Sequence, residues 1–165
     1  MAAVFVGRFQ PFHKGHLKAI DWILKKENFI FIVIGSSNEF FTQKNPLPFS
    51  KRKEMIEKVL INRGIKNFKV LGAKDVKSDK VWAKNILNLL KVKREDVVVY
   101  TKNPWTKKSF EEIGVKVKTH PLFFKSLSAT KIRQKIRNNE KWEHFVPKEM
   151  VEDLKKLLTR YFGCV

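Results

Sequence analysis

The sequence predicts an α/β fold: one domain built on a doubly wound parallel sheet of five strands, with further helices at the C-terminal end. Short apolar runs alternate five times with segments whose apolar residues have helical spacing. The run Phe29–Ile34 is apolar at six consecutive positions, as is typical of a strand covered on both faces. A chain of 165 residues can bury one sizeable core without disulfides, so we expect a single domain over residues 1–165.

Turn and cap residues divide this pattern into elements. Gly7 closes the first apolar run, and Gly64 and Gly114 follow helices. Ser50 and Ser128 are the expected N-caps of two helices. The expected strands are residues 2–6, 29–34, 68–71, 97–100 and 115–118, and the expected helices lie within residues 13–26, 50–63, 82–90, 103–113, 128–137 and 147–162.

Ligands of such sheets bind at the carboxyl ends of the strands, near the point where the strand order reverses. The seven glycines are never closer than eight residues apart, which excludes both G-x-G-x-x-G and G-x-x-x-x-G-K phosphate loops. Any nucleotide site must therefore use another device. The loops expected to form it are residues 7–13, 35–48, 72–80, 101–104 and 120–130.

The first strand-to-helix turn, GRFQPFHKGH, is the strongest candidate for an anion site. His13 and His16 are three residues apart in the first helical turn and point to one face, where free backbone N–H groups and the helix dipole favour phosphate. Arg8 and Lys14 add two cations. Two surface histidines or half of a metal site are the alternatives, although residues 2–20 contain no Cys, Asp or Glu to complete a zinc site.

A second candidate opens a helix near the C-terminal end. Ser128 and Thr130 supply hydroxyl groups, and Arg133 lies one turn further on, which together make an anion seat. The alternative is an ordinary serine cap beside solvated basic residues.

The net charge of +19 predicts anionic partners. Because 28 of the 35 basic residues are lysines spread along the chain, nucleic acid is the less favoured partner. No apolar stretch approaches the length of a membrane span, and the N-terminus has no basic leader before a long apolar region. A single cysteine, Cys164, excludes an intrachain disulfide, so we expect a cytoplasmic protein with no membrane partner.

These motifs resemble those of the HxGH nucleotidyltransferases, whose marks are H-x-G-H after the first strand and S-x-T-x-x-R late in the chain. The string GRFQPFHKGH is similar to that of the archaeal-type nicotinamide mononucleotide (NMN) adenylyltransferases, as are Arg52, Asn103-Pro104 and KWEHFVPK at residues 141–148. The resemblance covers nearly the whole chain and implies a Rossmann-like nucleotidyltransferase fold.

The resemblance implies that ATP and NMN, or its acid form, react to give NAD and pyrophosphate, with Mg²⁺ carried on the ATP phosphates and no metal ligand from protein side chains. It also implies a homo-oligomer. The catalytic residues it implies are Arg8, His13, Lys14, His16 and Arg133. The residues it implies for ATP binding are Gly7, Arg8, Phe9, His13, His16, Thr101, Asn103, Ser128, Thr130 and Arg133.

For the acceptor, the resemblance nominates Trp82 as a stacking platform, with Asp75 and Ser36 nearby; the alternative is that Trp82 belongs to the core. Phe9 and Phe12 could likewise be residues of the hydrophobic core. The positions that depart from the family pattern near this pocket are Phe40, Phe41, Lys77, Ser78, Asp79 and Lys102. They leave open a related enzyme with another phosphorylated acceptor, and a non-catalytic basic nucleic-acid binder stays the third hypothesis.

Overall fold

The computed structural model describes residues 1–161, with side chains described as far as residue 158. A five-stranded, wholly parallel sheet forms its centre, in the order β3-β2-β1-β4-β5. This confirms the predicted fold class, and the order reverses between β1 and β4. The strands are β1 (Ala2–Gly7), β2 (Phe29–Ile34), β3 (Phe68–Gly72), β4 (Val97–Tyr100) and β5 (Lys116–Lys118).

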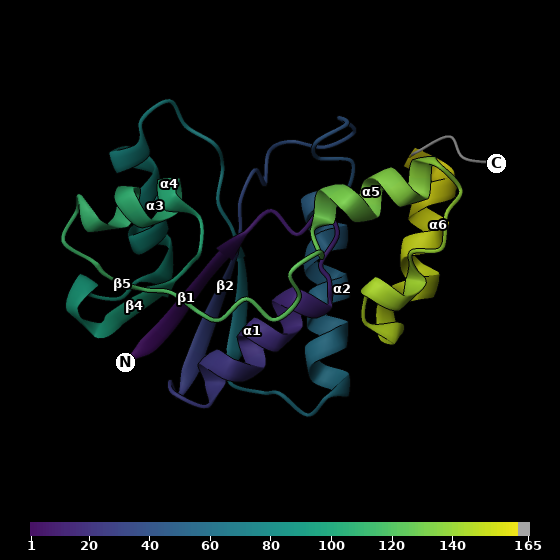
Figure 1. The fold of residues 1–165 in the computed structure, drawn as a ribbon. Coiled ribbons are helices and arrows are strands. Elements are labelled where there is room, and N and C mark those ends of the chain that lie inside the picture. Colours follow the sequence, from purple (N-terminus) through teal and green to yellow (C-terminus); the bar gives the residue numbers. More distant parts are fainter. Residues whose placement is uncertain (162–165) are drawn as a thin grey trace.

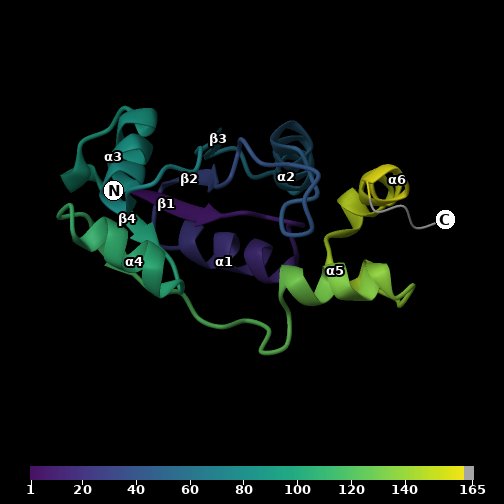
Figure 2. The same cartoon turned by 90° about the horizontal axis from the view of Figure 1, so that it is seen from above.

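Helices cover both faces of the sheet (Figures 1 and 2). On one face, α1 (Lys14–Leu24) and α2 (Phe49–Asn62) pack on Ala3 and Phe5, together with residues of the C-terminal helices α5 (Ala129–Arg137) and α6 (Val151–Tyr161). On the other face, α3 (Asp79–Leu90) and α4 (Pro104–Glu111) pack on Val4. Successive residues of β1 thus enter opposite layers, which is why this central strand is apolar, whereas the edge strands β3 and β5 carry lysines.

Three helix starts differ from the prediction. The helix expected within residues 82–90 begins at Asp79, because Ser78 caps it through the amide of Val81. Ser50 is not an N-cap, because α2 begins at Phe49 with Pro48 in the cap position and no side-chain cap bond. Pro147 opens a short 3-10 turn at Lys148–Met150, and α6 follows it at Val151. The last apolar position predicted for this helix, Phe162, lies outside the described residues, as does Cys164.

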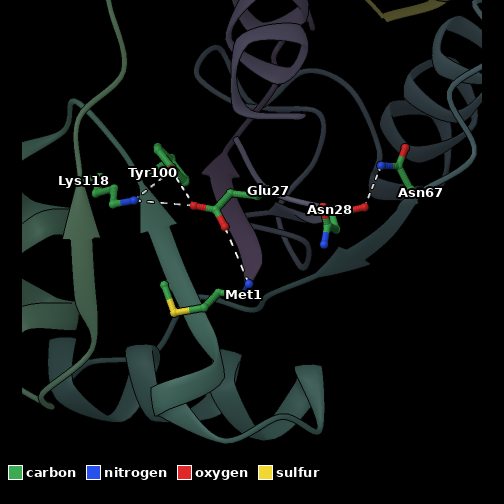
Figure 3. Close-up of polar contacts among 6 residues, drawn as sticks. All are labelled: Met1, Glu27, Asn28, Asn67, Tyr100 and Lys118. Carbon is green, nitrogen blue, oxygen red and sulfur yellow. Dashed lines mark hydrogen bonds and ion pairs between the residues drawn. The ribbon is translucent and has the colours of Figure 1, made fainter. Parts of the chain in front are cut away.

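A buried carboxylate ties the turn after α1 to the neighbouring strands (Figure 3). Glu27 accepts a 2.7 Å hydrogen bond from the hydroxyl of Tyr100, and it lies 3.5 Å from Nζ of Lys118 and 3.8 Å from the amino group of Met1. Burial, followed by the bond to Glu27, raises the pKa of the Tyr100 hydroxyl. The cluster therefore fixes β4 and β5 against the α1–β2 turn.

In the part of the chain that the structure describes, no helix combines the length and the apolar character that a membrane span requires.

Candidate functional site

A cavity of about 230 Å³ opens at the carboxyl ends of β1 and β4, where the strand order reverses. This is the position that the sheet topology predicts for a ligand. The β1–α1 turn, the β4–α4 loop and the segment that follows β5 each contribute one wall. The residues that line the cavity include Phe5, His13, His16, Thr101, Lys102, Asn103 and His120.

His13 and His16 form the floor of the site at the start of α1. His13 is the N-cap of the helix: its Nδ1 accepts hydrogen bonds from the backbone N–H groups of Gly15 (3.1 Å) and His16 (3.3 Å). The backbone N–H of His13 donates in return to Nδ1 of His16 at 3.2 Å. The two rings are stacked with centroids 3.6 Å apart, so the predicted shared face is confirmed.

This arrangement fixes the tautomer of both imidazoles. Because each Nδ1 accepts a hydrogen bond, each neutral ring carries its proton on Nε2. Burial lowers the pKa of His13 to about 4, and burial, followed by the nearby His13, holds the pKa of His16 well below its usual value. Both rings are therefore neutral donors at neutral pH.

The expectation of free backbone N–H groups at this helix start is wrong for two positions. The amides of Gly15 and His16 are taken by His13, and the amide of Leu17 donates to the carbonyl oxygen of His13. An anion here would meet imidazole Nε2–H groups rather than the peptide N–H groups of Gly15 and His16, because the cap residue is itself the histidine.

Phe9 and Phe12 are core residues, as their alternative reading held. Both are almost fully buried, and their rings contact the ring of His16 at centroid distances of 4.9 and 5.5 Å. Gly7 lies directly against Phe9: a Cβ at Gly7 would come within 2.8 Å of the ring. Gly7 and Phe9 therefore hold His16 in place from behind and do not line the cavity.

Several arginines gather beside this floor. Arg133 is 7% exposed. Its Nη1 donates to the carbonyl of Gln10 at 2.7 Å, and its Nη2 donates to the hydroxyl of Thr130 at 3.3 Å. Its buried Nε has no hydrogen-bond partner among the described residues. Burial, then Arg8 and Arg137, lower the pKa of Arg133. Like charges held together in this way favour a polyanionic ligand.

Arg52 is a structural residue of the site that sequence reasoning did not assign to it. Its guanidinium is 1% exposed and donates 2.9 Å hydrogen bonds to the backbone carbonyls of Arg8, Gly35 and Ser36. Burial lowers its pKa to about 10, against the opposing effect of Asp75. Arg52 therefore joins the loops that follow β1 and β2. The sequence does carry a signal for this role, because Arg52 is a basic residue on the apolar face of its helix.

At the start of α5, Ser128 is the N-cap, as predicted, and its Oγ accepts from the amide of Lys131 at 3.2 Å. The hydroxyls of Ser128 and Thr130 both act as acceptors, which leaves each hydroxyl proton available to a ligand oxygen. Neither residue lines the 230 Å³ cavity; Arg133 connects this helix start to the β1–α1 turn through its bonds to Thr130 and to the carbonyl of Gln10.

The β4–α4 loop is shaped by two further caps. Thr101 accepts from the amide of Asn103 at 3.1 Å, and Asn103 accepts from the amide of Thr106 at 3.1 Å as N-cap of α4, with Pro104 at the first helical position as predicted. Thr101 and Asn103 line the cavity. Lys102, noted above for its departure from the family pattern, lies between them and is the one permanently charged side chain among the described lining residues.

The three expected acceptor residues lie on loops and helices beyond this cavity. Ser36 is buried, and its carbonyl is held by Arg52. Asp75 is exposed, and its amide donates to Oδ1 of Asn38 at 3.0 Å. Trp82 is only 4% exposed and packs in the core of its layer, where Trp105, itself 45% exposed, lies over it with ring centroids 4.6 Å apart. Trp105 was not predicted.

His120 is a further residue that was not singled out, although it begins one of the loops expected at the site. It follows β5 and lines the cavity together with His13 and His16. No group of three or more His, Cys, Asp or Glu side chains within residues 1–158 is arranged to hold a metal ion. The side chains of the site therefore do not fit a protein-held metal.

This chain is similar to known proteins over most of its length. A family model described as cytidylyltransferase-like matches residues 4–135. The nicotinamide-nucleotide adenylyltransferase of Thermococcus sibiricus is 38% identical over 95% of this chain and 84% of its own length. That of Pyrococcus horikoshii is 36% identical over 93% and 82%.

Solved structures give the same picture. A bifunctional NMN adenylyltransferase/ADP ribose pyrophosphatase from Francisella tularensis, complexed with AMP and a manganese ion, superposes with a TM-score of 0.82 at 27% identity. The match covers 96% of this chain and 49% of that chain, so the present chain spans about half of the larger protein. A structure from Vibrio parahaemolyticus, with a TM-score of 0.64 at 18% identity over 95% of this chain and 97% of the other, shares the fold.

Proposed function

We propose that this chain, which belongs to the cytidylyltransferase-like family and to the archaeal nicotinamide-nucleotide adenylyltransferases, transfers the adenylyl group of ATP to nicotinamide mononucleotide. The products are NAD and pyrophosphate. The observation that carries the proposal is the pair of neutral imidazoles at the start of α1, which present Nε2–H donors at the strand-order reversal of the sheet.

The reaction asks the protein for positioning and charge compensation. The phosphate of the acceptor is already largely dianionic at neutral pH, so it attacks the α-phosphorus of ATP without a protein base. A new bond forms between this phosphorus and the acceptor oxygen, while the bond to the bridging oxygen of the β-phosphate breaks and pyrophosphate leaves with the electron pair. Donors that bind the α-phosphate more tightly as its charge grows lower the barrier.

In this scheme His16 donates from Nε2 to the α-phosphate and His13 donates to the neighbouring phosphates. Arg8, Lys14 and Arg133 hold the triphosphate and the departing pyrophosphate, with Ser128 and Thr130 as hydroxyl donors. The effect of Arg8 and Arg137 on the pKa of Arg133, which shows that these cations lie near one another, supports this assignment. Thr101 and Asn103, which line the cavity, bind the nucleoside part.

We further propose that Mg²⁺ enters with the phosphates of ATP and offsets part of their charge. The described side chains form no metal cluster of their own, so no residue is assigned as a ligand. The Francisella relative was solved with manganese and AMP, which supports the use of a divalent ion in the family.

For the acceptor, Ser36 and Asp75 remain candidates on the loops after β2 and β3, and an indole remains the proposed stacking surface. Because Trp105 covers Trp82, an acceptor ring can reach Trp82 only after Trp105 moves, whereas Trp105 itself is accessible. Replacing each tryptophan by leucine and measuring the KM for NMN separates the two. Replacement of the stacking residue should raise the KM for NMN and leave the KM for ATP unchanged.

The defining experiment measures pyrophosphate release with ATP and a panel of phosphorylated acceptors: NMN, nicotinic acid mononucleotide, phosphopantetheine and flavin mononucleotide. We expect turnover with one of the two pyridine nucleotides. His16→Ala should lower kcat by about 10²–10³, and His144→Ala, at an exposed histidine outside the site, should leave it unchanged. Near-normal turnover of His16→Ala would show that the assignment is wrong, and turnover with flavin mononucleotide or phosphopantetheine alone would favour the related transferase.

A cytoplasmic location and a homo-oligomeric state stay predictions. The first would be checked by cell fractionation and the second by light scattering of the purified protein. Salt-sensitive RNA binding without release of pyrophosphate from ATP would instead favour the non-catalytic basic binder.

A further inference from the structure

His120 follows β5, which ends at Lys118, and it lines the same cavity as the paired imidazoles of His13 and His16. The ring of Phe5 contacts His16 edge-on at 6.2 Å and His120 edge-on at 5.6 Å. Phe123 lies parallel to His120 at 6.4 Å. The plane of the His120 ring is therefore set by neighbouring aromatic rings, and its edge is directed by its own hydrogen bond.

That hydrogen bond gives His120 the opposite tautomer to His13 and His16. Its Nδ1 lies 2.9 Å from the carbonyl oxygen of Pro121. A carbonyl oxygen can only accept, so Nδ1 carries the proton and Nε2, at the other side of the ring, carries a lone pair. Among the described residues, no group hydrogen-bonds to this Nε2.

The charge state supports the same conclusion. Burial, and then the ammonium group of Lys102, lower the pKa of His120, while its bond to Pro121 acts in the opposite direction. The ring is therefore neutral at neutral pH, and its free nitrogen is an acceptor. The cavity is thus lined by two imidazole donors, His13 and His16, and by one imidazole acceptor, His120. Phosphate oxygens accept hydrogen bonds, so only the two donor rings suit them.

We infer that Nε2 of His120 accepts a hydrogen bond from the nucleoside part of the bound nucleotide and that it thereby helps to select ATP. The inference rests on the proposed function for the identity of the nucleotide. Two groups of ATP can supply the donor, namely the exocyclic amino group of adenine and a hydroxyl group of the ribose. A site that hydrogen-bonds a substrate group discriminates against an analogue that lacks it.

The test compares ATP with three analogues in the wild type and in His120→Phe. Inosine triphosphate has a carbonyl oxygen in place of the amino group, and 2′-deoxy-ATP and 3′-deoxy-ATP each lack one hydroxyl group. We expect the wild type to bind one of these about tenfold more weakly than ATP. The His120→Phe variant should bind ATP more weakly than the wild type by about the same factor. Its affinities for ATP and for that one analogue should therefore be equal.

Two further variants separate this role from a structural one. In His120→Gln, the side-chain oxygen takes the place of Nε2, so part of the discrimination should remain. His144→Phe makes the same change at an exposed histidine outside the cavity, and it should alter no ratio. Thermal unfolding of each variant shows whether it folds. If His120→Phe does not fold, the inference is tested by the ratio of the affinity for ATP to that for each analogue, compared between the wild type and His120→Gln.

The inference is overturned if the ratio of ATP to every analogue is the same in the wild type and in folded His120→Phe. Binding is measured by calorimetry without an acceptor, so the result does not depend on the proposed reaction. If discrimination disappears but no acceptor yields pyrophosphate, the proposed function fails and the role of His120 stands. If NAD forms while the affinity ratios are the same in the wild type and in His120→Phe, the proposed function stands and the role of His120 fails.

Discussion

Replacing His13 with asparagine should remove a specific part of the protein's sensitivity to acid. His13 holds the start of α1 by accepting two backbone hydrogen bonds at Nδ1, which it can do only while that nitrogen is unprotonated. A proton there would face the N–H groups of Gly15 and His16. Asparagine keeps an acceptor oxygen at the N-cap but does not titrate in this range, so it separates the cap from the ionisation.

The expected magnitude follows from the pKa of His13, which falls from 6.5 to about 4 on folding. Between these values the unfolded chain binds a proton that the folded protein does not, so stability is lost as the pH falls from 6.5 towards 4. A shift of this size corresponds to about 3 kcal/mol. The side chain is 8% exposed, so little solvent screening reduces this figure.

Urea unfolding at pH 7 and at pH 4, followed by circular dichroism, measures the effect. We expect the wild type to lose about 3 kcal/mol more of its free energy of unfolding than His13→Asn does. Carboxylates also titrate in this range, but they are common to both proteins and cancel. His144→Asn is the matched control and should behave as the wild type. Equal losses in the wild type and His13→Asn would refute the reasoning.

Three other substitutions test the packing that supports the site, each by urea unfolding at pH 7. Gly7→Ala should destabilise the protein by about 1–3 kcal/mol because its Cβ would meet the ring of Phe9 at 2.8 Å. Gly35→Ala is the control and should destabilise it much less, because the nearest atom to its Cβ lies 4.0 Å away. Equal losses of stability in the two variants would contradict this. Arg52→Met should cost about 3–5 kcal/mol because three backbone carbonyls lose a charged donor, and a change below about 1 kcal/mol would show that they find other partners. Tyr100→Phe should cost about 1–3 kcal/mol because it removes a donor from the buried carboxylate at the α1–β2 turn, and unchanged stability would contradict that role.

The features that depend on neighbouring residues were predictable from the sequence. Asn103 and Ser128 cap their helices as expected, because capping needs only a short polar side chain and the next turn of backbone. His13 and His16 share a face because helical geometry places residues three apart together. The exception is Ser50: α2 starts at Phe49, whose ring packs closely against Gly72, and this tertiary contact outweighs the local preference for a serine cap.

The features that depend on distant residues were not predictable. Arg133 bonds to the carbonyl of Gln10 across 123 positions, and Arg52 bonds to the carbonyl of Arg8 across 44. No local pattern shows which backbone oxygens a buried guanidinium will reach. Likewise, whether Trp82 is open to a ligand depends on Trp105, which is brought over it by the packing of α3 on α4.

Local sequence patterns were enough to predict the order of strands and helices, the edge of the sheet at which the cavity opens, and the histidine pair that lines it. Periodicity and capping act over a few residues, so the sequence displays them directly. The folded structure was needed to show which nitrogen of each imidazole carries the proton and which indole is exposed. Those properties depend on hydrogen-bond partners and desolvation, and both are set by the groups that folding brings together.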